Sequence, residues 1–327
     1  MAAPTLPSFA TDPSPATDRV AGDRARALGD RVYAGVIAAC AWVIPVLLLL
    51  VSLVIARSAW PALRTIGPAL LTDTVWDVPN GRFGTLPALL GTLVSSALAL
   101  ALATPLALGV AIFVTELAPP RLRRPVALLV DVLAAIPSVV YGLWALYVLV
   151  PFLRAVVMPF VAETLGLRVL PLFRGPAYGP SLLAASLVLA IMILPYIAAV
   201  AREVLRAVPR AQREAALALG ATRWEMIRDA VLPNARAGLV GATILGLGRA
   251  LGETMAVTMV IGNAHTLPTS LFQPAYTLAS LLANQFAEAS GALHISALMA
   301  AAGVLLAVTL VVNALARSLV RHTERRA

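Results

Sequence analysis

The chain has 327 residues, of which 60% are hydrophobic and 13% are charged. A soluble domain is about half apolar and a quarter charged, and much of its surface must face water. The composition therefore excludes a soluble globular protein and predicts an all-α polytopic membrane protein.

All 25 basic residues are arginines, and the formal net charge is +9. Without lysine the chain cannot build a phosphate-binding P-loop or form a Schiff base. Any ATP and Mg²⁺ that the protein uses would therefore be bound by another chain. The three histidines and the single cysteine lie far apart in the sequence, so we expect no metal site, and one cysteine allows no internal disulfide. We expect no cofactor on this chain.

Six apolar runs are each long enough to cross a hydrocarbon core of about 30 Å as a helix. They cover roughly residues 33–56, 85–116, 126–150, 180–201, 237–262 and 291–316. The preceding segment is rich in Ala, Pro, Ser, Thr and Asp, which predicts a disordered tail rather than a signal peptide. The predicted organisation is a tail over 1–31, a first membrane helix with an external segment over 32–84, a membrane domain over 85–317 and a C-terminal tail over 318–327.

The arginines are divided unequally between alternate loops. Eighteen of the 25 lie in the two terminal segments and in loops 118–125 and 202–236, whereas six lie in the other three loops. Arginine-rich loops stay on the cytoplasmic side of a membrane, so we expect both termini in the cytoplasm. This placement explains the positive charge through topology and membrane lipid, and we expect no nucleic-acid partner.

The long arginine-rich loop has the pattern of two short helices joined by a tight turn. Pro209 suits the start of the first helix, and Gly220 suits the residue just after its end. Thr222 and Glu225 have capping-box spacing for a second helix. We expect Pro233 to close that second helix.

The second short helix would carry Trp224, Ile227 and Val231 on one side. An apolar stripe outside the bilayer has to be buried somewhere. It could pack on the protein's own helices, or it could dock into a groove on another protein. A DNA-binding helix-turn-helix has a similar outline, but six membrane spans around it make that role remote.

The fifth apolar run contains Arg249 and Glu253. An arginine at the bilayer centre costs ~2.5–3.5 kcal/mol on insertion scales, so we expect Glu253, one helical turn further on, to pair with it. The pair could be structural, with Gly248 and Gly252 as a GxxxG helix-packing motif. It could instead line a substrate pathway and attract an anion, because guanidinium matches phosphate geometry. Charged residues inside membrane spans usually mark substrate pathways, which favours a substrate pathway over a structural pair.

Two carboxylates flank the short loop between the second and third runs. We expect Glu116 and Asp131 to pair with arginines of that loop, which are Arg121, Arg123 and Arg124. These pairs predict a structural role.

One spacing in the 202–236 loop resembles the EAA loop of permease subunits of ABC importers. The positions that match are Glu214, Ala215, Ala216, Gly220, Leu232 and Pro233, whereas the usual isoleucine is replaced by Ala230. The resemblance implies a coupling helix, here carrying Trp224 and Ile227, that is seated in a cleft of a cytoplasmic ATPase.

Three further stretches resemble the PstC-type permease subunits of phosphate ABC importers. They are residues 83–87, 135–144 and 248–258, and the last differs from the PstA-type sister subunit, which more often continues Thr-Ala-Pro after the glutamate. The resemblance implies a type I ABC importer permease fold in the bacterial inner membrane and a non-enzymatic, pore-forming chain. It also implies a PstA-type sister permease, a PstB-type ATPase dimer and a PstS-type periplasmic phosphate-binding protein. Arg249 and Glu253 match residues linked in the family to phosphate passage.

Three alternatives stay open from the residues alone. The chain could be a permease for another oxyanion, such as sulfate or molybdate. It could be an ion-coupled carrier or channel that works without an ATPase. It could also be a regulatory membrane scaffold.

Overall fold

The computed structural model describes residues 16–324. The chain divides into two units, residues 1–54 and 55–327. Helix α1 (Ala16–Ile66) supplies all of the described part of the first unit. The prediction of a disordered tail is wrong for residues 16–31, because this Ala- and Arg-containing stretch extends an existing helix at no further nucleation cost. The rest of that predicted tail, residues 1–15, lies outside the described residues.

The second unit is helical except for one short hairpin. After α1 its elements are α2 (Ala69–Thr72), β1 (Trp76–Asp77), β2 (Arg82–Phe83), α3 (Leu86–Ile112), α4 (Pro120–Ala135), α5 (Ser138–Trp144), α6 (Val150–Phe152), α7 (Leu182–Ala207), α8 (Arg210–Ala218), α9 (Arg223–Glu225), α10 (Leu232–Gly252), α11 (Met255–Val260), α12 (Leu278–Glu288) and α13 (Ala292–Glu324). Wider π-helical turns extend several of these helices, at Phe113–Leu117, Ala145–Leu149, Leu153–Val157, Phe160–Thr164 and Met226–Val231.

Six helices in the described part of the chain are long and apolar enough to cross a membrane, which confirms the predicted number. They cover Tyr33–Ile66, Leu86–Leu117, Ser138–Thr164, Leu182–Ala207, Arg223–Gly252 and Ala292–Ser318. The chain is therefore a multi-pass membrane protein.

The third span differs from its predicted range of 126–150. The helix is interrupted at Ile136, whose ψ of 129° is extended, and α5 starts after Pro137. The ring of a proline pushes the preceding residue out of the helical region. Residues 120–135 thus form a separate helix, and the span continues to Thr164. Composition alone does not show this break, because the sequence is apolar on both sides of it.

Helix α7 forms the centre of the second unit, and its apolar window is 61% buried. Helix α3 packs on it through a row of fully buried alanines spaced four residues apart, at positions 99, 103, 107 and 111. Small residues let the two backbones approach closely, as is usual between membrane helices. Helix α10 packs on the same central helix, where a Cβ on Gly246 would lie 2.6 Å from Cγ1 of Ile197.

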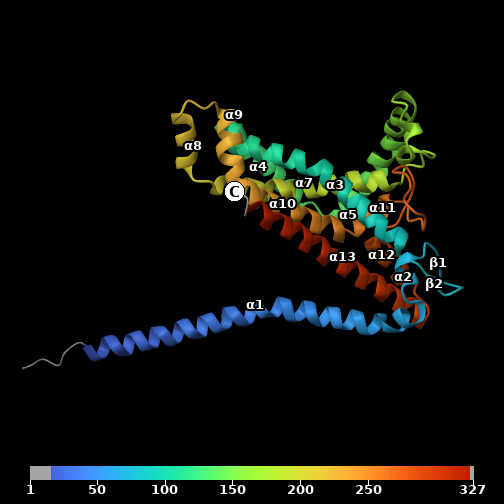
Figure 1. The fold of residues 1–327 in the computed structure, drawn as a ribbon, viewed down its shortest axis with the longest axis horizontal. Helices are drawn as coiled ribbons and strands as arrows, with labels where there is room; N and C mark the ends of the chain where they lie inside the picture. The colour runs from blue at the N-terminus through green and yellow to red at the C-terminus, as the bar shows by residue number, and fades with distance from the viewer. Residues whose placement is uncertain (1–15, 325–327) are drawn as a thin grey trace, which may run out of the picture. The chain divides into compact units, whose positions relative to one another are not determined.

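The two ends of this bundle differ in character (Figure 1). Helices α8 and α9 lie at one end, and the β1–β2 hairpin lies at the other. Near the hairpin Trp76 stacks on His265 with 5.5 Å between the ring centroids, and Tyr276 approaches His265 to 4.4 Å. Neither ring nitrogen of His265 has a hydrogen-bond partner among the described residues, and burial lowers its pKa to about 4.

The last turns of α1 join α13 through a hydroxyl group inserted into the helix. The Ala62 N–H donates to Oγ of Ser296 at 2.9 Å, and this hydroxyl donates to the carbonyl of Ser58 at 2.9 Å. Ser296 therefore bridges the two backbone groups that an undisturbed α-helix would join directly.

Candidate functional site

The helix that carries Arg249 ends at Gly252, ten residues before the end of the predicted run over 237–262. Helix α10 ends at Gly252, and Glu253 is extended with ψ of 125°. The Thr254 hydroxyl donates to the Gly252 carbonyl at 3.3 Å, and the Glu253 carboxylate accepts from the Ala256 N–H at 3.4 Å. Side chains therefore satisfy backbone groups on both sides of the break, so the predicted continuous span over 237–262 is wrong.

The break removes the geometry that an Arg249–Glu253 pair needs, because residues four apart face each other only in a helix. None of the ion pairs in the described chain includes Arg249. Its guanidinium lies instead over the ring of Tyr196 on α7, with 4.3 Å from Cζ to the ring centroid. The predicted ion pair does not form, and the guanidinium keeps its full positive charge.

A cavity of about 520 Å³ opens beside this guanidinium. Its lining is Tyr196, Val200, Leu245, Gly248, Arg249, Gly252 and Glu253. The Arg249 Nε is buried and has no hydrogen-bond partner within residues 16–324. A cavity with one unpaired cation and an unused donor can attract and orient an oxyanion.

Gly248 and Gly252 line that cavity and make no close helix contact within the described chain. A Cβ on Gly248 would approach Asn313 to 3.9 Å, and a Cβ on Gly252 would meet nothing within 4 Å. Close packing of α10 is provided by Gly246 instead. A packing role for the predicted pair would require a second chain.

The predicted pair of helices in the arginine-rich loop is confirmed. Helix α8 starts after Pro209, and Gly220 follows its end with a φ of 88°. The capping box between Thr222 and Glu225 is complete. The predicted stop at Pro233 is wrong: the proline is the second residue of α10, and the helix runs unbroken from Arg223 to Gly252. The π-helical turns just before the proline widen the helix where its missing N–H interrupts the hydrogen bonds.

The apolar stripe predicted on this second helix is divided between two environments. Ile227 and Val231 are fully buried in the protein's own core, as the self-packing interpretation predicts. Trp224 is 58% exposed, and two leucines on or next to α8, Leu217 and Leu219, are 45% and 89% exposed. An apolar surface thus stays uncovered in this chain.

The other residues that match the EAA pattern mostly face outward. Glu214, Ala215, Gly220 and Pro233 are exposed, whereas Ala216 and Leu232 are partly buried against the core. The matching positions that remain accessible lie on α8, at the turn and at the start of α10.

Two ion pairs attach this loop to the membrane helices, and their partners differ from those predicted. Arg213 on α8 donates to both carboxylate oxygens of Glu116, at 2.9 and 3.3 Å, and also to the carbonyls of Leu205 and Val208. Arg202 on α7 donates to Asp131 on α4 at 2.6 Å. The partners come from distant segments because α7 packs on α3 and α4, and because Arg213 of α8 reaches the π-helical turn that follows α3.

The family model for "binding-protein-dependent transport system inner membrane component" matches residues 103–327. The chain belongs to this family. Among curated relatives, this permease is similar to the phosphate transport system permease protein PstC of Mesorhizobium japonicum, with 43% identity over 96% of this chain and 97% of the relative. PstC of Haemophilus influenzae is 45% identical over 85% of this chain and 88% of the relative. PstC 2 of Mycobacterium tuberculosis is 41% identical over 89% of this chain and 91% of the relative.

A solved structure of the MetNI methionine ABC transporter, in an inward-facing conformation, supports the fold of the permease. It aligns with a TM-score of 0.54 and 20% identity over 71% of this chain and 93% of that chain. The chain thus has the type I ABC importer permease fold predicted from its sequence.

Sequence reasoning missed Tyr196 and Arg213. Tyr196 lies in a helix 53 residues before Arg249, and no periodicity within either helix relates the two positions. Arg213 is one of seven arginines in its loop, and its contact with Glu116 depends on how α8 folds back. The excess of arginine in that loop was the available signal, but it does not identify the residue.

Proposed function

We propose that this chain is a permease subunit of an ATP-driven importer of inorganic phosphate. The observation that carries the proposal is the similarity over nearly the whole chain to permeases named for phosphate transport. The uncompensated guanidinium of Arg249 beside a cavity is the feature that fits an anionic substrate. The chain forms half of the pathway, and a PstA-type sister subunit supplies the rest.

In this proposal Arg249 is a weak, transient site for phosphate. A guanidinium offers two parallel donors to an oxyanion, and the ring of Tyr196 holds it in place without neutralising it. Glu253, which lines the same cavity, limits the affinity by repelling the anion. Weak binding suits transport, because a tightly held ion would not leave.

ATP and Mg²⁺ are bound by a PstB-type ATPase dimer on the cytoplasmic side of the bacterial inner membrane. The arginine-rich loops favour this orientation. Glu214, Ala215, Gly220 and Trp224 form the accessible coupling surface of α8 and α9. ATP binding closes the ATPases, which move the coupling helices together and tilt the spans, so that the cavity turns outward to receive phosphate from a PstS-type protein.

The test is uptake of labelled phosphate by liposomes that contain the four-protein complex and internal ATP. We expect Arg249→Gln to abolish uptake while the complex still assembles, because glutamine keeps the shape of the site but not its charge. Arg317→Gln removes one exposed charge from α13 and serves as the matched control, with uptake unchanged. Normal uptake by the Arg249→Gln complex would limit this residue to a packing role.

The same liposomes separate the alternatives. Strong inhibition of uptake by sulfate or molybdate at a concentration equal to that of phosphate would indicate a different oxyanion as substrate. Uptake without ATP or ATPase would indicate an ion-coupled carrier or channel. A complex that assembles but moves no phosphate would indicate a regulatory scaffold.

A further inference from the structure

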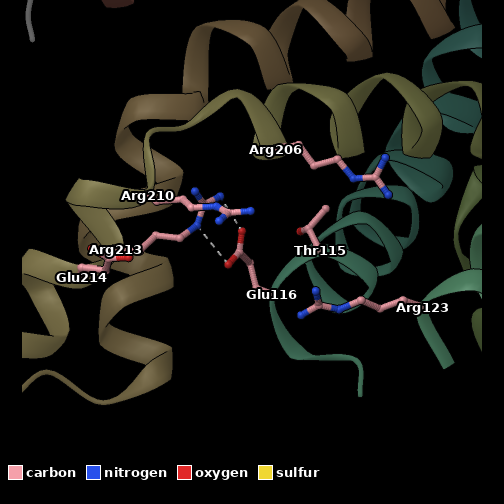
Figure 2. A pocket seen from close by; sticks show the side chains of 7 residues that line it. All are labelled: Thr115, Glu116, Arg123, Arg206, Arg210, Arg213 and Glu214. Atoms are coloured by element: carbon pink, nitrogen blue, oxygen red, sulfur yellow. Dashed lines mark hydrogen bonds and ion pairs between the residues drawn. The ribbon is translucent and has the colours of Figure 1, made fainter. Parts of the chain in front are cut away.

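A second cavity, distant in sequence from Arg249, lies where α8 meets the membrane helices. We call it the arginine pocket, and its lining is Thr115, Glu116, Arg123, Arg206, Arg210, Arg213 and Glu214 (Figure 2). These residues come from the π-helical end of α3 and from α4, α7 and α8. The cavity measures about 620 Å³, within the ~300–1,000 Å³ of pockets that hold small ligands.

Two of its four arginines are committed to the fold. Arg213 is engaged by Glu116 and by two backbone carbonyls, and its side chain is 18% exposed. The Arg123 Nε donates to the Ala118 carbonyl at 3.0 Å. These contacts form a rigid wall for the pocket.

The other two arginines keep most of their donors free. Arg206 uses one nitrogen in an exposed pair with Glu203 on its own helix. Arg210 forms no ion pair or side-chain hydrogen bond with any residue between 16 and 324. Figure 2 shows Arg210 beside Arg213 near Glu116, and the Arg206 side chain extending past Thr115 on the other side of the pocket. Several unused guanidinium donors therefore border one cavity.

The pocket lining carries a net positive charge. Once Glu116 is neutralised by Arg213, three arginines and one carboxylate, that of Glu214, remain in the lining, and Arg206 is also paired with Glu203 outside it. Guanidinium groups on separate elements that converge on a cavity suit a small tetrahedral oxyanion, to which each can donate in parallel. We propose that the arginine pocket binds a phosphate group, either free inorganic phosphate or the headgroup of an anionic phospholipid.

Such a ligand would connect α8 to α4 and α7 through Arg210, Arg123 and Arg206. It would hold the loop against the membrane helices and so stabilise the folded chain by mass action. The inference uses neither Arg249 nor the direction of transport.

The experiment uses the full-length chain in detergent with Arg249→Gln, so that a response to phosphate cannot come from the mid-membrane cavity. Thermal unfolding is followed during titration with inorganic phosphate, with sodium chloride keeping the ionic strength constant. We expect a saturable rise in the unfolding midpoint. Adding Arg206→Gln and Arg210→Gln should abolish it, whereas Arg121→Gln with Arg223→Gln, which remove two exposed arginines outside the pocket, should preserve it.

The double variant keeps both structural contacts of Arg213 and Arg123, and its unliganded midpoint checks that it folds. The single Arg210→Gln change provides a second measure: phosphate should bind about tenfold or more weakly, as expected for one lost charge-assisted hydrogen bond. Equal responses in the two double variants would overturn the proposal, and so would a parent that responds neither to free phosphate nor to the anionic lipid of the next experiment.

A lipid arm identifies the source of the phosphate group. The same variants are placed in nanodiscs of phosphatidylcholine with or without phosphatidylglycerol. A midpoint raised by phosphatidylglycerol, and then insensitive to free phosphate, assigns the pocket to a headgroup; a response to free phosphate in both lipids assigns it to the ion. If neither source acts and the pocket variant instead loses ATPase association, the pocket is a docking surface and the proposal is wrong.

Discussion

A guanidinium within a membrane helix is stable only if its desolvation is compensated, and Arg249 obtains this from an aromatic ring. The contact with Tyr196 is worth ~0.5–2 kcal/mol, of the same order as the cost on insertion scales. An ion pair would compensate the same cost but would also cancel the charge. A ring leaves the charge available to an anion, which explains how one residue can be both tolerated and functional.

His265 leads to a prediction about acid stability. Its pKa is about 4 in the folded chain because the ring is buried, against about 6.5 when unfolded. The unfolded state therefore binds more protons between these values, so stability rises with pH from about 4 to about 6.5 and is constant above that. His265→Phe should flatten this dependence, as measured by unfolding midpoints of the purified chain.

The pKa of Asp73 lies below that pH range, so a change at Asp73 serves as a control for the histidine. Its hydrogen-bonded pair with Arg82 holds its pKa below the usual value of 3.8, so its contribution is lost only at lower pH. An Asp73→Asn chain should keep the slope between pH 4 and 6.5. If the slope persists unchanged in His265→Phe, that histidine is not its cause.

Among the elements, α3 contains two glycines with opposite requirements. A Cβ on Gly91 would lie 2.0 Å from the Tyr276 carbonyl oxygen, whereas one on Gly109 would meet nothing within 4 Å. Gly91→Ala should lower stability by about 1–3 kcal/mol through overpacking. Gly109→Ala should raise it by about 0.5–1 kcal/mol, because alanine favours the helix. Unfolding midpoints that move in the same direction would contradict the close approach of α3 to the 263–277 loop.

The helix after the Gly220 turn carries one residue that is available for docking and another that belongs to the folded core. Trp224 is 58% exposed and Ile227 is fully buried. Trp224→Ala should weaken co-purification with the ATPase while leaving the unfolding midpoint nearly unchanged. Ile227→Ala should lower stability by about 2–5 kcal/mol by creating a cavity. A Trp224→Ala chain that still holds the ATPase would show that the coupling surface lies elsewhere.

Local sequence signals predicted the elements well where one short motif decides the geometry. The Gly220 turn and the Thr222 capping box are of this kind, because a left-handed residue and a reciprocal cap need only neighbours in the chain. The breaks at Ile136 and Glu253 were missed because apolar composition continues across them. Tyr196 was missed because its contact depends on the packing of two distant helices.

For the whole molecule, the number of spans follows from composition, but the attachment of the loop to the spans does not. The pair between Arg213 and Glu116 connects α8 to the end of α3, and both side chains are largely buried, at 18% and 7% exposed. This ion pair therefore attaches α8 to a second span. This link was predicted with the wrong arginines because charge pairing across the fold cannot be read from neighbours in sequence.

Glu116→Gln should lower stability by about 3 kcal/mol, because it leaves the Arg213 charge buried without a carboxylate. In the reconstituted complex it should reduce phosphate taken up per ATP hydrolysed, since the ATPase still binds but the loop is less firmly attached. Asp229→Asn removes an exposed partner of Arg228 and should leave stability nearly unchanged, because solvent screens the pair. Equal effects of the two changes on the unfolding midpoint would contradict the structural role of the buried pair.

Trp224 and Arg249 lie near opposite ends of the same helix, Arg223–Gly252. At 1.5 Å per residue the two side chains are separated by about 37 Å along the axis, so a tilt of about 5° would displace one end by about 3 Å relative to the other. A displacement of that size is comparable to the reach of a hydrogen bond. A force applied near Trp224 would therefore shift the guanidinium of Arg249, and the π-helical turns at Met226–Val231 are where this helix could bend and absorb part of the shift.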